Sequence, residues 1–156
     1  MEEKHSLKRI VFSVVVVLLL SLLISCGEHK TDVTNYLVGN WNEPVDKDSL
    51  IYGDDSFGGF HGDGEVYAVY DIIDVKEIID DYCTPSEGQY IMNKLKFYVK
   101  FEDEMTAPVF KNVPKEYQFD YDSEYYCKYV KDGRGGQLFA LLDEINSRLY
   151  YIVIVM

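Results

Sequence analysis

The sequence predicts a mostly β domain: an antiparallel meander of about seven or eight strands that forms a small barrel or a sandwich. Three observations support this fold class. Several short segments alternate apolar and polar side chains, as half-buried strands do. Segments rich in Gly, Pro, Asn and Asp separate them at short intervals, as turns do. The 14 tyrosines suit strand surfaces on which the ring packs and the hydroxyl meets water. The pattern leaves room for one short helix.

The chain begins like an export signal. Lys4, Lys8 and Arg9 make the first nine residues basic, and residues 10–24 are then apolar apart from two serines. A helix that crosses a bilayer needs about 20 apolar residues. The shorter run fits the hydrophobic region of a secretory signal, which follows a basic start. An uncleaved anchor is the alternative.

Leu23-Ile24-Ser25-Cys26 ends this run and resembles the lipobox of bacterial lipoproteins. The resemblance implies a diacylglycerol on the Cys26 sulfur, cleavage before Cys26 and further acylation of its amino group, such as by palmitate. Two or three acyl chains anchor a protein stably. Residues 1–25 are then the signal peptide and residues 26–35 a lipidated tether outside the cytoplasm. Gly27, where Asp would favour inner-membrane retention, favours the outer membrane if the cell has one.

The part that follows the signal is small and acidic. Residues 26–156 hold 12 Lys and Arg against 25 Asp and Glu, a formal charge of −13. About 130 residues suffice for one domain, which we expect at 36–156. The charge argues against nucleic acid as a partner, because phosphates would be repelled. It serves either solubility or a surface for a cation or a cationic partner.

The first elements expected are strands. Residues 36–41, which contain Gly39 and Trp41, open the domain, and residues 50–52 form a second short strand. Residues 53–64 hold five glycines and predict a loop. Residues 65–73 alternate between two faces, which predicts a strand.

The middle of the chain is mixed. Asp74 and Glu77 have the spacing of a helix start, so residues 74–82 are interpreted as the short helix, with a strand as the alternative. Residues 84–88 predict a turn. Residues 90–101 alternate clearly in their second half and predict a long strand.

The last third again favours strands. Residues 117–121 and 124–130 are expected to form a hairpin around a turn at Asp122-Ser123, and residues 131–136 another turn. Residues 137–145 fit a helix or a strand equally well. Residues 148–156 are apolar and β-branched in a continuous run, which predicts a central strand buried on both faces.

Cys83 and Cys127 are the cysteines that remain after Cys26. An exported compartment permits disulfides, and an even pair suggests one bridge. In the chain-entropy model a loop of this length contributes about 4 kcal/mol. A catalytic thiol or a metal site is the alternative, but the chain has no CxxC.

Gly39-Asn40-Trp41 after a short tether resembles the opening of lipocalin-like bacterial lipoproteins. Residues 60–66 (FHGDGEV) and 87–95 (EGQYIMNKL) resemble two later motifs of that family, in the same order. The resemblance implies a meander barrel with Gly39 and Trp41 as a structural motif at its base. Residues 74–82 and the paired cysteines depart from the family pattern.

Signatures of catalysis, phosphate binding and metal binding are missing. Asp120, Asp122 and Glu124 begin like a calcium loop, but Tyr125 replaces its glycine and no glutamate closes it. We therefore expect a non-enzymatic, lipid-anchored protein without cofactor, catalytic residues or metal ligands. It either binds a small apolar ligand or has a structural role in the envelope. The alternative is a protein-interaction module, an inhibitor or accessory subunit that uses an acidic, tyrosine-rich surface.

Overall fold

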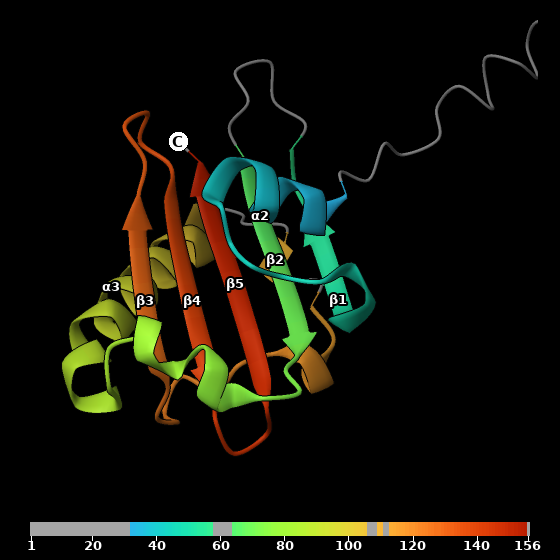
Figure 1. Cartoon of the computed structure of the whole chain (residues 1–156). Helices are drawn as coiled ribbons and strands as arrows, with labels where there is room; N and C mark the ends of the chain where they lie inside the picture. The colour runs from blue at the N-terminus through green and yellow to red at the C-terminus, as the bar shows by residue number, and fades with distance from the viewer. Residues whose placement is uncertain (1–31, 58–63, 106–108, 111–112, 156) are drawn as a thin grey trace, which may run out of the picture.

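A five-stranded antiparallel sheet forms the centre of the fold (Figure 1). The computed structural model describes residues 32–57, 64–105, 109–110 and 113–155, with the backbone alone for 99–105. The strand order is β1-β2-β5-β4-β3. The strands are β1 (Leu50–Asp55), β2 (Gly64–Asp71), β3 (Tyr126–Lys131), β4 (Gln137–Asp143) and β5 (Arg148–Val155).

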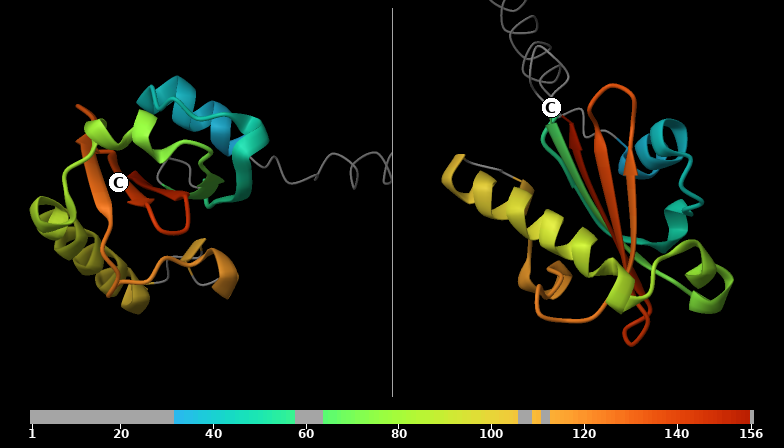
Figure 2. Two further views of the ribbon diagram at one scale, coloured as in Figure 1. Left: turned by 60° about the horizontal axis from the view of Figure 1, so that its bottom comes forward. Right: turned by 90° about the vertical axis from the view of Figure 1, so that its left-hand side faces the viewer.

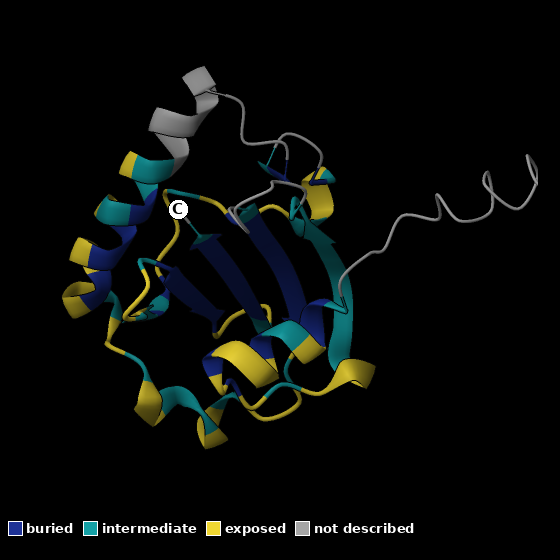
Figure 3. Ribbon diagram, turned by 90° about the horizontal axis from the view of Figure 1, so that it is seen from above, coloured by how far each residue is buried: buried dark blue, intermediate teal, exposed yellow. Residues whose placement is uncertain are grey.

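The β5 strand lies in the middle of the sheet, which confirms the central, doubly buried strand expected at 148–156. It pairs with β2 from Arg148 to Val155 and with β4 from Arg148 to Ile154. Six of its residues in a row are buried (Figure 3). An apolar run without alternation is what two covered faces require.

One helix covers each face of the sheet (Figure 2). Val66, Ala68 and Tyr70 of β2 belong to the apolar core on the side of α2 (Val33–Trp41). Tyr67 and Val69 belong to the core on the side of α3 (Pro85–Met105). The domain is thus mostly β and antiparallel, as predicted.

The residues that the structure describes do not form the expected barrel. Among the described residues the sheet is open, since β1 pairs with β2 alone and β3 with β4. Two segments interpreted as strands, 36–41 and 90–101, lie in α2 and α3 instead. Because these helices cover the two faces, the core is enclosed without closing the sheet on itself.

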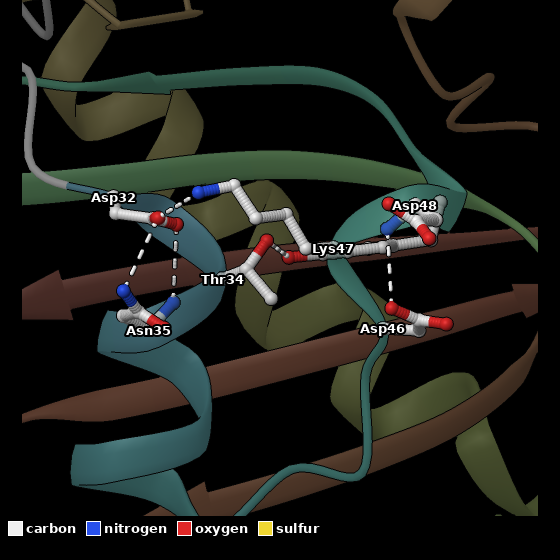
Figure 4. A network of polar contacts seen from close by, with 7 residues as sticks. Asp32, Thr34, Asn35, Asp46, Lys47 and Asp48 are labelled. Carbon is white, nitrogen blue, oxygen red and sulfur yellow. Dashed lines mark hydrogen bonds and ion pairs between the residues drawn. The ribbon is translucent and has the colours of Figure 1, made fainter.

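The helix α2 replaces the strand expected at 36–41. Asp32 is the N-cap of this helix. The Asp32 carboxylate accepts a hydrogen bond from the Asn35 amide (3.3 Å) and forms an ion pair with Lys47 (Figure 4). Val33, Leu37 and Trp41 are buried on the sheet side, whereas Asn35 and Gly39, which would share that face in a strand, are exposed as the period of a helix requires. The described fold thus starts a few residues before 36.

The helix α3 replaces both the turn at 84–88 and the strand at 90–101. The Glu87 carboxylate accepts hydrogen bonds from the Thr84 amide (3.1 Å) and hydroxyl (2.8 Å), and Pro85 is the first helical residue. Ile91, Met92 and Leu95 are buried. Phe97 is 65% exposed.

The remaining predictions divide. Residues 74–82 form two short 3-10 helices, Val75–Glu77 and Ile79–Asp81, rather than one α-helix. Residues 137–143 are the strand β4, which decides between the two alternatives for 137–145. Residues 118–121 form no strand, although a turn is present where one was expected, at 121–123. Two more 3-10 helices, Lys47–Ser49 and Lys115–Tyr117, lie in connections.

Three tyrosines are fully buried, although we expected tyrosine hydroxyls to reach water. The hydroxyls of Tyr67, Tyr70 and Tyr151 each have an internal partner, so burial leaves no phenol oxygen without a hydrogen bond. The Tyr67 hydroxyl donates to the Tyr117 carbonyl (2.8 Å). The Tyr70 hydroxyl lies 3.0 Å from the Thr34 hydroxyl.

Candidate binding surface at one end of the sheet

Acidic side chains, tyrosines and exposed isoleucines gather where β2 and β4 end and β5 begins. Asp71 and Asp143 both pair in register with Arg148, so three strands reach this end together. It is the lower end of the sheet in Figure 1 and comes forward in the left view of Figure 2. We call it the acidic end.

A tight turn at residues 120–125 forms the middle of the acidic end. The Asp120 carboxylate accepts hydrogen bonds from the Asp122 amide (3.0 Å) and the Ser123 hydroxyl (3.1 Å). These bonds, the Asp122 amide first, lower the pKa of Asp120. The Asp120 amide donates to the Tyr125 hydroxyl (2.9 Å). The turn is therefore fixed from both sides and keeps a negative charge.

Tyr125 is the buried residue at the end of this turn. Its side chain is 4% exposed and packs edge-on against the rings of Phe119 and Tyr150. Burial raises the pKa of Tyr125 to about 12, although the bond from Asp120 opposes the rise. The phenol is thus neutral and acts as an acceptor for the backbone, not as a base.

The first of two clefts beside the turn has a volume of about 490 Å³. One wall is the start of α3, which contributes Pro85, Ser86 and Gln89, and the other wall is residues 121–125. Lys96 on α3 reaches across to within 3.8 Å of the Asp122 carboxylate. Polar atoms line most of the cleft, so it suits a polar or charged group rather than a lipid.

The second cleft, about 330 Å³, lies on the other side of the turn and shares Ser123 and Tyr125 with the first. It is lined further by Asp120, Asp143 and Arg148. The Arg148 guanidinium donates to the Glu116 carbonyl (2.7 Å), which holds it against the protein. The two clefts therefore make one continuous surface around the turn.

Two exposed isoleucines belong to the chain segments at the acidic end. Ile145 in the β4–β5 turn is 93% exposed, and Ile73, just after β2, is 103% exposed. The two segments are joined by a hydrogen bond from the Ile72 amide to the Ser147 carbonyl (2.8 Å). Segments 71–81 and 143–148 together hold seven acidic residues and two basic ones. Apolar side chains rimmed by charge are typical of protein contact surfaces.

A buried charge cluster lies elsewhere, on the α2 side of the sheet. The Glu43 side chain is 2% exposed, and its carboxylate is 2.9 Å from the Lys128 ammonium. The Tyr151 hydroxyl donates to the same carboxylate (3.0 Å). The adjoining cavity measures about 40 Å³, which is room for little more than water. The cluster ties the end of α2 to β3 and β5 and has no space for a substrate.

Sequence reasoning missed Glu43, Lys128 and Tyr151 as a group. Lys128 and Tyr151 follow Glu43 by 85 and 108 positions along the chain, so no local spacing signals their contact.

The site residues expected from the sequence have different outcomes. Cys26 lies outside the described residues, as does His61. Gly39 and Trp41 lie on α2, at no barrel base, and a side chain at Gly39 would meet nothing within 4 Å. Trp41 is a buried residue of the α2-side core.

Cys83 and Cys127 lie directly opposite each other as free thiols. In the parts of the chain with described side chains, no cluster of three or more His, Cys, Asp or Glu residues is placed to hold a metal ion. Within the same parts no helix is long and apolar enough to span a membrane.

Comparisons with protein-family models, with curated proteins and with solved structures found no match.

Proposed function

We propose that this protein is an exported lipoprotein, held to a membrane by lipid on Cys26, whose domain is a non-enzymatic module that binds a protein partner at its acidic end. The lipobox resemblance at residues 23–26 supports the anchor. The anchor faces a compartment outside the cytoplasm, on the outer membrane if the cell has one. Nucleic acid is not the partner, because the formal charge of residues 26–156 is −13.

The observation that carries the proposal is the pair of exposed isoleucines among the acidic residues of the acidic end. Burying a fully exposed isoleucine contributes about 1.5 to 3 kcal/mol. Ile73 and Ile145 are exposed in the isolated domain, so this stabilisation becomes available only when a partner covers them. The acidic rim favours a partner whose contact surface is basic and contains an apolar depression.

A small apolar ligand is the weaker candidate. Both faces of the sheet are filled by side chains of the two cores. The two large clefts have polar linings, and the cavity beside Glu43 is about 40 Å³. Ligand pockets usually measure about 300 Å³ or more and are mostly apolar. This packing favours a partner at the surface over cargo inside.

The anchor is tested by replacing Cys26. In the native cell the wild-type chain should fractionate with membranes, and its N-terminal peptide should begin at Cys26 with the mass of attached acyl chains. Cys26→Ala should abolish both. Ser25→Ala, which keeps a small residue before the cysteine, is the matched control and should retain both. An unmodified Cys26 in the wild type would refute the anchor.

The binding surface is tested by photo-crosslinking in intact cells, with the crosslinker at position 145 or, as a control, at Val38 on α2. We expect a discrete adduct at 145 and none at 38. The partner is then purified, and its affinity is measured by calorimetry. Ile73→Ser with Ile145→Ser should weaken binding at least tenfold, and Val38→Ser should not. Equal affinity of both variants would contradict the proposed surface.

A further inference from the structure

Cys83 and Cys127 are joined through their backbones at the edge of the sheet. The Cys83 amide donates to the Cys127 carbonyl (2.8 Å), and the Cys127 amide donates to the Cys83 carbonyl (3.0 Å). Residues that exchange both bonds have Cα atoms about 5.5 Å apart and side chains on the same face. Disulfides need Cα atoms about 4.4 to 6.8 Å apart. The Cα separation expected for this pair therefore lies within the range that a disulfide needs.

The two cysteines also mark the bases of the two walls of the first cleft. Cys83 precedes the start of α3 at Pro85 by two residues, and Cys127 follows Tyr125 by two residues. Gly88 in the first turns of α3 lies against Cys127. A Cβ atom at Gly88 would be 2.9 Å from the Cys127 Cβ and 3.0 Å from its sulfur. The helix thus rests on the buried cysteine.

We propose that Cys83 and Cys127 form a disulfide and that this bond clamps the two walls of the first cleft at a fixed separation. The clamp regulates the surface assigned above to partner binding, and in that respect it rests on the proposed function. With the bond intact, the start of α3 and residues 121–125 move as one unit. With the bond reduced, two backbone hydrogen bonds and side-chain packing hold the walls together.

The reaction is a thiol–disulfide exchange with an oxidant that carries a disulfide of its own. The exposed Cys83 loses its proton and attacks that disulfide, forming a mixed disulfide and releasing one thiol of the oxidant. The Cys127 sulfur, after losing its proton, displaces the second thiol. The two cysteines lose two electrons and two protons, and the oxidant becomes a dithiol. Burial raises the pKa of the Cys127 thiol to about 12, which favours Cys83 as the first nucleophile.

The bond itself is tested on the full chain, purified in detergent from its native membrane. The protein is denatured and alkylated with or without prior reduction, and its mass is measured. We expect alkylation at Cys83 and Cys127 after reduction only. If both thiols react without reduction, the purified chain is treated with an oxidised and reduced glutathione mixture. Failure to form the bond in this mixture would overturn the proposal. Formation of the bond would support the pairing and would show that the chain does not reach an oxidising compartment in the cell.

The clamp is tested by hydrogen exchange of the same protein. Reduction should raise exchange at residues 84–92 and 121–126 at least tenfold and leave α2 and β1 unchanged. It should also lower the Tm by about 10 °C. Cys83→Ser, which leaves the buried Cys127 in place, should match the reduced wild type with and without reductant. A disulfide whose reduction leaves exchange in both walls unchanged would refute the clamp. No binding partner enters these measurements, so their failure is separate from that of the binding surface.

Discussion

Glu43 shows how one residue can depend on partners far away in the sequence. Its buried carboxylate is paired with the Lys128 ammonium and the Tyr151 hydroxyl. Removing one partner of a buried pair leaves the other charge without compensation, which is more costly than losing an exposed pair. The cluster therefore fixes the chain between α2 and β1 on the sheet.

Lys128→Met tests the buried pair. We expect the free energy of unfolding to fall by about 3 kcal/mol, measured by urea denaturation. Lys47→Met is the matched control, because Lys47 pairs with Asp32 at the surface. Because solvent screens an exposed pair, we expect a smaller loss for Lys47→Met. Equal losses in the two variants would show that the Glu43 carboxylate does not need its ammonium partner.

Two glycines within helices provide a second test, at the scale of the element. A Cβ atom at Gly88 in α3 would lie 2.9 Å from the Cys127 Cβ, whereas one at Gly39 in α2 meets nothing within 4 Å. Alanine is favoured over glycine in helices by about 1 kcal/mol. Gly39→Ala should therefore raise the Tm and Gly88→Ala should lower it. A higher Tm for both would mean that α3 does not rest on Cys127.

The central strand β5 gives a third test. Deleting residues 152–156 removes part of the pairing with both β2 and β4 and the buried side chains of Ile152, Val153 and Ile154. We expect loss of the cooperative thermal transition in far-ultraviolet circular dichroism. Val155→Ala, at a half-buried position, should keep the transition. A cooperative transition in the truncated chain would contradict the central role of β5.

Local signals account for what the sequence could predict among these elements. The alternation of β2 and the continuous apolar run of β5 are both strong local signals, and both strands are where they were expected. For α3, alternation at Leu95, Phe97 and Val99 competed with the helical spacing of Ile91, Met92 and Leu95. The helix start Thr84-Pro85-Ser86-Glu87 was a readable signal that favoured the helix. Asp32 was the corresponding signal for α2.

The acidic charge and the many tyrosines led us to expect an acidic, tyrosine-rich face, which stays a prediction. At the acidic end Tyr125 and Tyr150 are buried, so the charge rather than the tyrosines matches that expectation. The assembly of the acidic end from residues 71–73, 118–125 and 143–148 depends on strand pairing over long separations, which sequence spacing does not encode. The interpretation of Gly39 and Trp41 as a barrel base was wrong because those residues belong to a helix.

For the whole molecule, buried phenols predict sensitivity to alkaline pH. Burial raises the pKa of Tyr67, Tyr82 and Tyr151, and that of Tyr125 to about 12. Unfolded tyrosines titrate near pH 10. Above about pH 10 the unfolded chain loses protons that the folded chain keeps, so the free energy of unfolding falls as pH rises.

Urea midpoints at about pH 9 and about pH 11 measure this effect. Tyr125 alone should contribute a loss of about 1 kcal/mol between these two pH values, because its pKa is about 12 in the folded chain and about 10 in the unfolded chain. Tyr125→Phe should reduce the dependence on pH by that share, although the variant also loses the bond from the Asp120 amide. A midpoint that stays constant up to about pH 12 would contradict the burial of these phenols.

The place of β5 between β2 and β4 also affects how the domain is made. Ribosomes supply β1 to β4 first, as two hairpins that share no edge until Arg148–Val155 arrives between them. An emerging chain can therefore form half-sheets but not the finished core. For the exported lipoprotein proposed above, this order would delay completion of the core until the last strand has crossed the membrane.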